Sequence, residues 1–172
     1  AVANGSFTVA KIKEKYNHKK IVFFVGRHVP YKGIDYLIES DKYINEDCMI
    51  LIGGTGEKSA SLKEMAKDHP RIKFIGRLSN NEVKYYLHAS DVFAFPSINR
   101  SEAFGVALAE ALYCGLPAVS FNIDGSGTMW VNQNNKTGIV VENKNVEKFG
   151  EAISILLGND ILRKQMSENA KE

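Results

Sequence analysis

Two cations follow the first strongly apolar stretch of the chain. Residues 21–25 form this stretch, and Gly26, Arg27 and then Lys32 come after it. Arginine can bind phosphate oxygens bidentately, and a nearby lysine adds a second positive charge. The alternative is a pair of solvated surface charges, but the position of both residues after a predicted strand favours a receptor for a diphosphate.

Two carboxylates, Glu102 and Glu110, lie on one predicted helix. Eight residues of helix rise about 12 Å and rotate by about 80°, so the two side chains lie on overlapping faces. One can accept hydroxyl groups of a sugar and the other those of a ribose, while Gly105 leaves the backbone open to phosphates. Glu110 has apolar neighbours, where an unpaired carboxylate is costly, and this favours a functional role. For Glu102 the alternative is an ordinary first-turn acid favoured by the helix dipole.

Several other signals are weak. Gly54 and Gly56 resemble the start of a dinucleotide-binding fingerprint, but Ser59 stands where the third glycine is needed, and there is no Walker A motif. The four histidines are scattered. Only His28 lies near the predicted phosphate site, and we expect it to be a surface side chain.

The predicted elements alternate between strand and helix. We expect strands at 21–25, 48–52, 71–75, 91–95, 117–121 and 137–141, and helices at 33–44, 58–67, 81–89, 102–113, 146–157 and 160–170. Continuous apolar strands belong in parallel sheets, where helices cover both faces. The pattern predicts an α/β fold with a doubly wound, Rossmann-like parallel sheet. In such sheets ligands bind outside the carboxyl ends of the strands, where the cations and glycines above are expected.

Composition restricts the function classes. We expect one domain over residues 1–172, with a core from about residue 21 to residue 170 after a polar lead-in. The net charge of +2 is too small to favour a nucleic-acid partner. There is no secretory signal, and no apolar run approaches the roughly 20 residues needed to span a bilayer. Cys48 and Cys114 belong to no metal-binding cluster, so we expect reduced core thiols in a cytoplasmic protein.

A set of short motifs resembles the C-terminal domain of family 4 glycosyltransferases, which have the two-domain GT-B fold. The motifs are GR at 26–27, KGIDYL at 32–37, IGGTG at 52–56, FIGRL at 74–78, PS at 96–97, EAFG at 102–105, EA at 110–111 and GLP at 115–117. Each is weak alone, but their order and spacing are specific, and the resemblance covers about residues 21–170.

The resemblance implies a role for each matching residue. Arg27 and Lys32 would bind the donor diphosphate and stabilise its charge as it leaves, and Glu102 would face the donor sugar; these three are the implied catalytic residues. Glu110 would hold the ribose. The implied donor-binding residues are Gly26, Gly54, Arg77, Leu78, Phe104, Gly105, Val106 and Glu110, with Arg77 and Leu78 against the base. Such enzymes retain anomeric configuration and typically need neither metal nor cofactor, in agreement with the lack of an Asp-x-Asp motif.

One segment departs from the family pattern. Residues 124–132 lack the usual glycine pair followed by a glutamate, and this variant resembles bacterial polysaccharide or lipopolysaccharide transferases for mannose- or rhamnose-type sugars. The chain starts at Ala1, which suggests excision from a longer protein. We expect the acceptor site in an absent N-terminal domain, so that the isolated chain is inactive. Any peripheral contact with the inner face of a membrane would also reside in that domain.

Two other classes of function remain. The first is a nucleotide-binding module or degenerate non-catalytic subunit of the same fold, against which the joint presence of Arg27, Lys32, Glu102 and Glu110 argues. The second is a nucleotide-sugar epimerase or a phosphorylase. An epimerase should bring histidine and acidic residues into the cleft, and a phosphorylase should have a lysine for pyridoxal phosphate. Failure to bind any nucleotide would favour the non-catalytic module.

Overall fold

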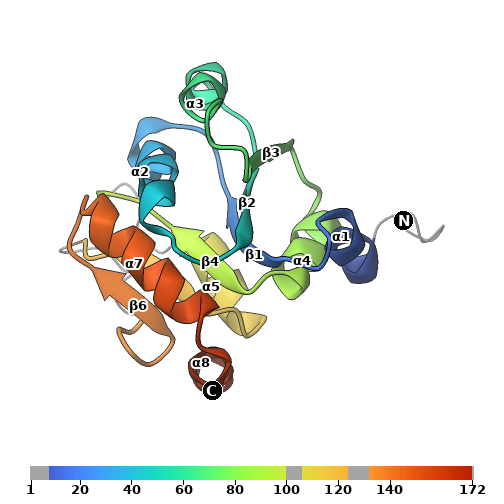
Figure 1. Cartoon of the computed structure of the whole chain (residues 1–172), viewed down its shortest axis with the longest axis vertical. Helices are drawn as coiled ribbons and strands as arrows, with labels where there is room; N and C mark the ends of the chain where they lie inside the picture. Colours follow the sequence, from blue (N-terminus) through green and yellow to red (C-terminus); the bar gives the residue numbers. More distant parts are fainter. Residues whose placement is uncertain (1–7, 100–105, 124–131, 172) are drawn as a thin grey trace.

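A six-stranded parallel sheet forms the centre of the computed structural model, which describes residues 8–99, 106–123 and 132–171 (Figure 1). The strand order is β3-β2-β1-β4-β5-β6, and each neighbouring pair is parallel. The strands are β1 (Lys20–Val25), β2 (Cys48–Gly53), β3 (Ile72–Gly76), β4 (Val92–Phe95), β5 (Ala118–Phe121) and β6 (Gly138–Val141). This order confirms the predicted doubly wound, Rossmann-like α/β fold.

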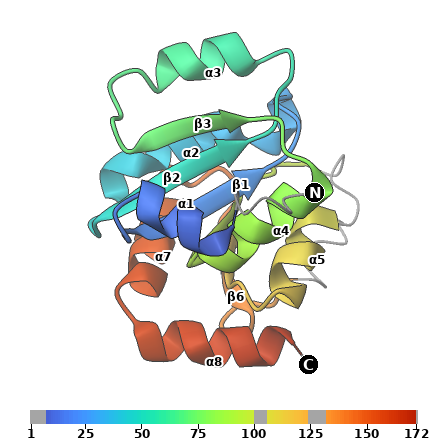
Figure 2. The ribbon, with the colours of Figure 1, turned by 90° about the vertical axis from the view of Figure 1, so that its right-hand side faces the viewer.

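Helices cover both faces of the sheet. They are α1 (Val9–Lys15), α2 (Ile34–Ser40), α3 (Ser59–Met65), α4 (Asn80–Ala89), α5 (Val106–Tyr113), α7 (Val146–Leu157) and α8 (Asp160–Ala170), with 3₁₀ turns η2 (Pro30–Lys32) and η3 (Asp41–Tyr43). One core lies between the sheet and α2, α3 and α7, and the other between the sheet and α1, α4 and α5. Figure 2 shows the second group in front of the sheet and α2 and α7 behind it.

Strand β1 is buried on both of its faces. Val22 and Phe24 belong to the core beneath α2 and α7, whereas Ile21 and Phe23 belong to the core beneath α1 and α4. All four side chains are almost completely buried. Because successive side chains of a strand point to opposite faces, a strand covered on both sides needs apolar residues at every position.

The core starts before residue 21, because the polar lead-in contains a helix. Residues Val9–Lys15 form α1, which Thr8 caps by accepting a hydrogen bond from the backbone N–H of Lys11 at 3.2 Å. Ile12 and Tyr16 are buried against α4 and extend the core toward the N-terminus. Their helical spacing is hidden in the sequence among lysines, which stay on the exposed side of this short helix.

The helix predicted for residues 33–44 ends earlier than expected. Helix α2 stops at Ser40, whose hydroxyl donates to the carbonyl of Leu37 at 2.7 Å, and the chain tightens into η3. Serine hydroxyls often bond to the preceding turn in this way and so weaken the helical ladder. The carbonyl groups released there are taken up by an arginine from a distant part of the chain.

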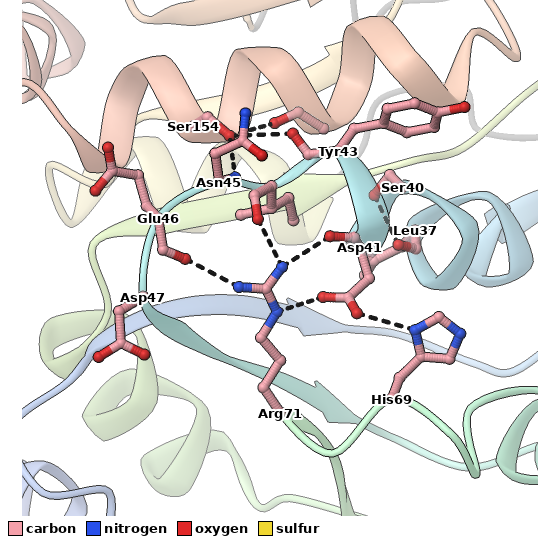
Figure 3. A network of polar contacts seen from close by, with 12 residues as sticks. Leu37, Ser40, Asp41, Tyr43, Asn45, Glu46, Asp47, His69, Arg71 and Ser154 are labelled. Carbon is pink, nitrogen blue, oxygen red and sulfur yellow. Dashed lines mark hydrogen bonds and ion pairs between the residues drawn. The ribbon is translucent and has the colours of Figure 1, made fainter.

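Arg71, just before β3, joins the α2–β2 connection to the α3–β3 connection (Figure 3). Its Nε donates to the carboxylate of Asp41, and its two Nη atoms donate to the carbonyls of Asp41, Ile44 and Glu46 at 2.7–2.9 Å. His69 Nδ1 lies 2.9 Å from the other carboxylate oxygen of Asp41. The network fixes the amino end of β3, away from the edge where the predicted site residues lie.

Both cysteines are free thiols, as predicted, but only one lies in the core. Cys48 is fully buried at the start of β2, and burial raises the pKa of its thiol to about 11. Cys114 is half-buried directly after α5, and its pKa is also raised by burial. Neither thiol is therefore ionised to a useful extent at neutral pH.

We predict that Arg71→Ala lowers the free energy of unfolding by about 2–3 kcal/mol, because it removes several charge-assisted hydrogen bonds and leaves the buried carboxylate of Asp41 without its main partner. Urea denaturation measures this loss. Lys67→Ala is the matched control, since it removes only an exposed ion pair with Glu64 and should cost less than about 0.5 kcal/mol. Equal effects of the two substitutions would contradict the assigned role of the network.

A candidate anion-binding site at the carboxyl edge of the sheet

The loop after β1 carries both predicted phosphate-binding cations. Lys32, at the end of η2, places its Nζ 5.9 Å from the ring centroid of Phe95 in β4 and 5.5 Å from that of Tyr31. Its Cε atom lies 3.6 Å from the position that a Cβ would take on Gly26. The lysine side chain therefore lies across the ends of β1 and β4, where the two aromatic faces favour its charge.

Arg27 is exposed directly after the end of β1. Its guanidinium has no hydrogen-bond or ion-pair partner within the described ranges. Most of the partly buried cations of this protein are paired, as Arg71 and Arg163 are. An exposed arginine that has no partner in the described part of the chain, on the same loop as a second cation, is available to bind an anion.

The backbones of three neighbouring strands meet beside these cations. Gly54 has a φ of +96°, and a Cβ on it would lie 2.0 Å from the carbonyl oxygen of Gly26. Only glycine fits such a position. The N–H of Gly54 donates to the carbonyl of Gly76 at 2.8 Å, and Leu78 Cδ1 lies 3.0 Å from the Cβ position of Gly53. The structure thus brings together Gly26, Gly54 and Leu78 from the ends of β1, β2 and β3.

His28, expected at the surface, is instead 1% exposed. Its Nδ1 lies 2.8 Å from Ser59 Oγ, and its Nε2 lies 3.3 Å from the carbonyl oxygen of Gly53. Phe74 packs edge-on against the ring, at 6.0 Å between centroids. Burial lowers the pKa of His28, and the charge of Lys63 adds to this effect. A single histidine between an arginine and a valine carries no sequence signal for burial, because its partners come from another loop.

On its other side, the β1–α2 loop is fixed to the chain that follows β4. The N–H of Ile98 donates to the carbonyl of Tyr31 at 3.0 Å, and Asn143 Nδ2 donates to the carbonyl of Ile98 at 2.9 Å. Asn143 follows β6, so three separate connections meet at this point. Asn143 carries no signal in the sequence, because an isolated asparagine after a strand is typical of any turn.

Glu110 and Val106 line a groove of about 530 Å³ between α4 and α5. The other lining residues are Asn80, Lys84, Leu87, Ala109, Tyr113 and Cys114. Glu110 is exposed, so the premise that its apolar sequence neighbours make its charge costly is wrong. Those neighbours split between the two sides of α5: Leu108, Ala111 and Leu112 are buried against the sheet, while Val106 is 68% exposed.

Arg77 and Leu78 link this groove to the strand ends. They lead from β3 into α4, and Arg77 is exposed. Helix α4 starts with a capping box, in which Ser79 Oγ accepts from the N–H of Glu82 while the Glu82 carboxylate accepts from the N–H of Ser79. This double cap fixes the direction in which the chain leaves Arg77. The predicted base-contacting pair therefore lies between the glycine edge and the groove.

Some predicted residues lie outside the described part of the chain. They are Glu102, Phe104 and Gly105, together with most of the variant segment at 124–132. Among the residues that are described, no group of three or more His, Cys, Asp and Glu side chains is arranged to hold a metal ion. None of the described helices is long and apolar enough to cross a membrane.

A second hollow lies away from the carboxyl ends of the strands. It has a volume of about 560 Å³ and is formed by the end of α1, β2, β3 and α4. Its lining includes three lysines, Lys15, Lys19 and Lys73, alongside Tyr16 and Tyr86. No residue of the motifs at 26–37 or 102–111 lines it, so it is separate from the site described above.

Comparison with known proteins identifies the chain's relatives. It is 33% identical, over 82% of its length, to the GDP-mannose-dependent monoacylated alpha-(1-6)-phosphatidylinositol monomannoside mannosyltransferase of Corynebacterium glutamicum, of which 39% is covered. It is 32% identical, over 88% of its length, to the D-rhamnosyltransferase WbpZ of Pseudomonas aeruginosa, of which 40% is covered. The chain thus spans less than half the length of these relatives.

The solved structure of Anabaena HepE in complex with UDP superimposes with a TM-score of 0.85 at 19% identity, which establishes similarity of fold. The superposition covers 95% of this chain and 46% of HepE, in line with one half of a GT-B enzyme. The family described as "Glycosyl transferases group 1" matches residues 7–172. With nearly its whole length matched and with the parallel sheet of that fold, the chain belongs to the group 1 glycosyltransferase family.

Proposed function

We propose that this chain is the donor-binding half of a retaining glycosyltransferase and that it binds a nucleoside-diphosphate sugar at the carboxyl edge of its sheet. The observation that carries the proposal is the exposed guanidinium of Arg27, which has no partner among the described residues, on the same loop as Lys32, at strand ends where only glycine fits. A diphosphate supplies the two or more negative charges that such a pair of cations needs.

The diphosphate lies between the two cations and the first turn of α5 in this proposal. Arg27 binds phosphate oxygens through its planar fork, and Lys32 supplies a point charge. The N-terminal end of α5 adds the partial positive charge of the helix dipole. Phe104 and Gly105 precede this turn in the sequence, and Glu102 faces the transferred sugar.

The nucleoside lies toward the groove between α4 and α5. Glu110 is exposed on the wall of this groove and accepts the ribose hydroxyls. Arg77 and Leu78, at the entrance to α4, contact the base together with the backbone of Gly54. The volume of about 530 Å³ fits a nucleoside-sized ligand, and ligand pockets commonly start at about 300 Å³.

The bond between sugar and phosphate breaks through an oxocarbenium-like transition state, as in glycoside chemistry generally. Negative charge then grows on the departing diphosphate, where Arg27, Lys32 and the α5 terminus stabilise it. Fixed cations and a helix terminus thus provide the charge stabilisation that a metal ion gives in other enzymes. The acceptor comes from another part of a longer protein, so the isolated chain binds donor without sustained transfer.

The transferred sugar belongs to the hexose class, and we place the enzyme in bacterial polysaccharide or lipopolysaccharide synthesis. The support is twofold. The variant segment at 124–132 has the pattern of mannose- and rhamnose-type transferases, and two relatives are named as a mannosyltransferase that depends on GDP-mannose and as a D-rhamnosyltransferase. The base follows from which nucleoside diphosphate the chain binds.

We predict that Arg27→Ala weakens the binding of UDP or GDP, whichever the wild type binds, by about 10- to 100-fold, and that adding Lys32→Ala weakens it further. A charge-assisted hydrogen bond contributes roughly 1.5–3 kcal/mol, which is the basis of this range. Isothermal titration calorimetry measures the affinities. Lys164→Ala is the control, because this exposed lysine lies by the hollow formed around Pro117, before β5, at the opposite edge. Equal affinities of wild type and the double variant would refute the assignment.

Glu110→Gln should weaken nucleoside diphosphate binding by about 3- to 30-fold, because the carboxylate accepts ribose hydroxyls more strongly than an amide does. The same substitution should have little effect on a 2′,3′-dideoxynucleoside diphosphate, which lacks these hydroxyls. Calorimetric titrations of both ligands into both proteins give the interaction energy between the Glu110 carboxylate and the ribose hydroxyls. Glu147→Gln, an exposed acid on α7, serves as the control. If both ligands lose affinity equally, Glu110 does not hold the ribose.

A further inference from the structure

His28 bonds to the β2–α3 loop in one consistent donor–acceptor pattern. The carbonyl of Gly53 can only accept, so Nε2 carries the proton and donates to it. Nδ1 is then an acceptor and receives the hydroxyl proton of Ser59 at 2.8 Å. Ser59 Oγ in turn accepts from the N–H of Gly56 at 2.9 Å. Each donor and acceptor in this series of hydrogen bonds has a partner when the imidazole is neutral.

Backbone contacts join the same two loops. The N–H of His28 donates to the carbonyl of Thr55 at 3.0 Å, and its carbonyl accepts from the N–H of Lys58 at 3.0 Å. A Cβ on Gly56 would lie 2.7 Å from both the N and the O atom of His28. The loops are therefore in direct backbone contact, and the residue after Arg27 is held by main chain and side chain together.

A role in filling space alone does not explain this side chain. A buried position next to Phe74 would accept an apolar residue at lower cost, since each buried polar atom must be satisfied. His28 instead bonds in two directions to groups from β2 and α3, while Arg27, its sequence neighbour, is exposed at the edge of the sheet. The ring is buried and bonded away from the ligand side, so it does not contact the donor.

We propose that His28 is a positioning residue, which holds Arg27 and the β1–α2 loop in place for the diphosphate by locking this loop to residues 53–59. The inference rests on the proposed function, because it takes Arg27 to be a phosphate ligand. It goes beyond that function in assigning the alignment of the cation to a buried contact between two loops.

Protonation of the imidazole breaks this lock. A proton on Nδ1 removes the acceptor of the Ser59 hydroxyl. The groups that face the ring are the Gly53 carbonyl of β2, Phe74 of β3, and Ser59 and the cation of Lys63 on α3. Burial and Lys63 lower the pKa of His28 below its ordinary value. The unfolded chain therefore takes up the proton first, so the stabilisation is complete above about pH 6.5 and is lost as the pH falls through the lowered pKa.

The lock itself can be tested without ligand. Amide hydrogen exchange should accelerate by about tenfold at His28 and Gly56 in His28→Leu and in Ser59→Ala, in keeping with the loss of one or two hydrogen bonds. His28→Gln should keep slow exchange at these amides, because its amide group can still donate to the Gly53 carbonyl. His88→Leu, which replaces an exposed histidine of α4, is the control. Unchanged exchange in folded His28→Leu protein would overturn the lock.

The consequence for binding is tested by titrating UDP, GDP and ADP into the same variants at pH 7.5 and 5.5. We expect His28→Leu and Ser59→Ala to weaken binding by about 3- to 10-fold at pH 7.5, and His28→Gln to stay close to wild type. The β-phosphate also takes up a proton in this range. The loss of affinity between pH 7.5 and pH 5.5 is therefore compared between wild type and His28→Gln. We expect this loss to be larger for wild type.

The outcomes separate the two claims. If wild type binds a nucleotide, Arg27→Ala loses it, and folded His28→Leu binds with wild-type affinity, the positioning role is refuted while the donor site stands. If wild type binds none of UDP, GDP and ADP at either pH, the proposed function is overturned and the positioning role with it. An equal pH effect in wild type and His28→Gln, at a pH where NMR shows the His28 imidazole to be protonated, would overturn the dependence on neutral imidazole.

Discussion

The close approach of the β1 and β2 ends is the constraint on which the candidate site depends. The α-carbon of Gly54 lies so near the carbonyl of Gly26 that a single added methyl group would overlap it at 2.0 Å. Any other residue at Gly54 would push the two strand ends apart. The separation would carry the β1–α2 loop away from residues 53–59, and with it the contacts of His28 and the position of Arg27. The backbone contact between Gly54 and Gly26 therefore sets the positions of the side chains that form the site.

The two edges of the sheet are stabilised in contrasting ways. At the amino end of β3, the guanidinium of Arg71 donates hydrogen bonds to one carboxylate and three carbonyl groups. At the carboxyl edge, Arg27 has no partner among the described residues, and Lys32 lies against aromatic rings. Two cations on one short loop repel each other, and such an arrangement is typical of a binding site rather than of a structural one.

The fold was predictable from the sequence because it is encoded locally. Residues 21–25 and 48–52 are continuously apolar, and glycines follow them, so both strands and their ends could be assigned before the structure was known. Helix α1 was missed because Ile12 and Tyr16 are too few to show a helical period among lysines. The burial of His28 depends on Ser59 and Gly53, which are distant in sequence, and the exposure of Glu110 depends on which side of α5 faces the sheet. Such features follow from tertiary packing, which single-sequence patterns do not contain.

We propose above all that an anion binds at the carboxyl ends of β1 and β2. An amide NMR titration of the chain with UDP, GDP and ADP tests it most directly. We expect that one of these nucleotides shifts the amide signals of Gly26, Arg27, Gly54 and Val106, with little change at Gly115 on the opposite edge. Shifts confined to the hollow lined by Lys15, Lys19 and Lys73, or no shifts at millimolar nucleotide, would contradict it.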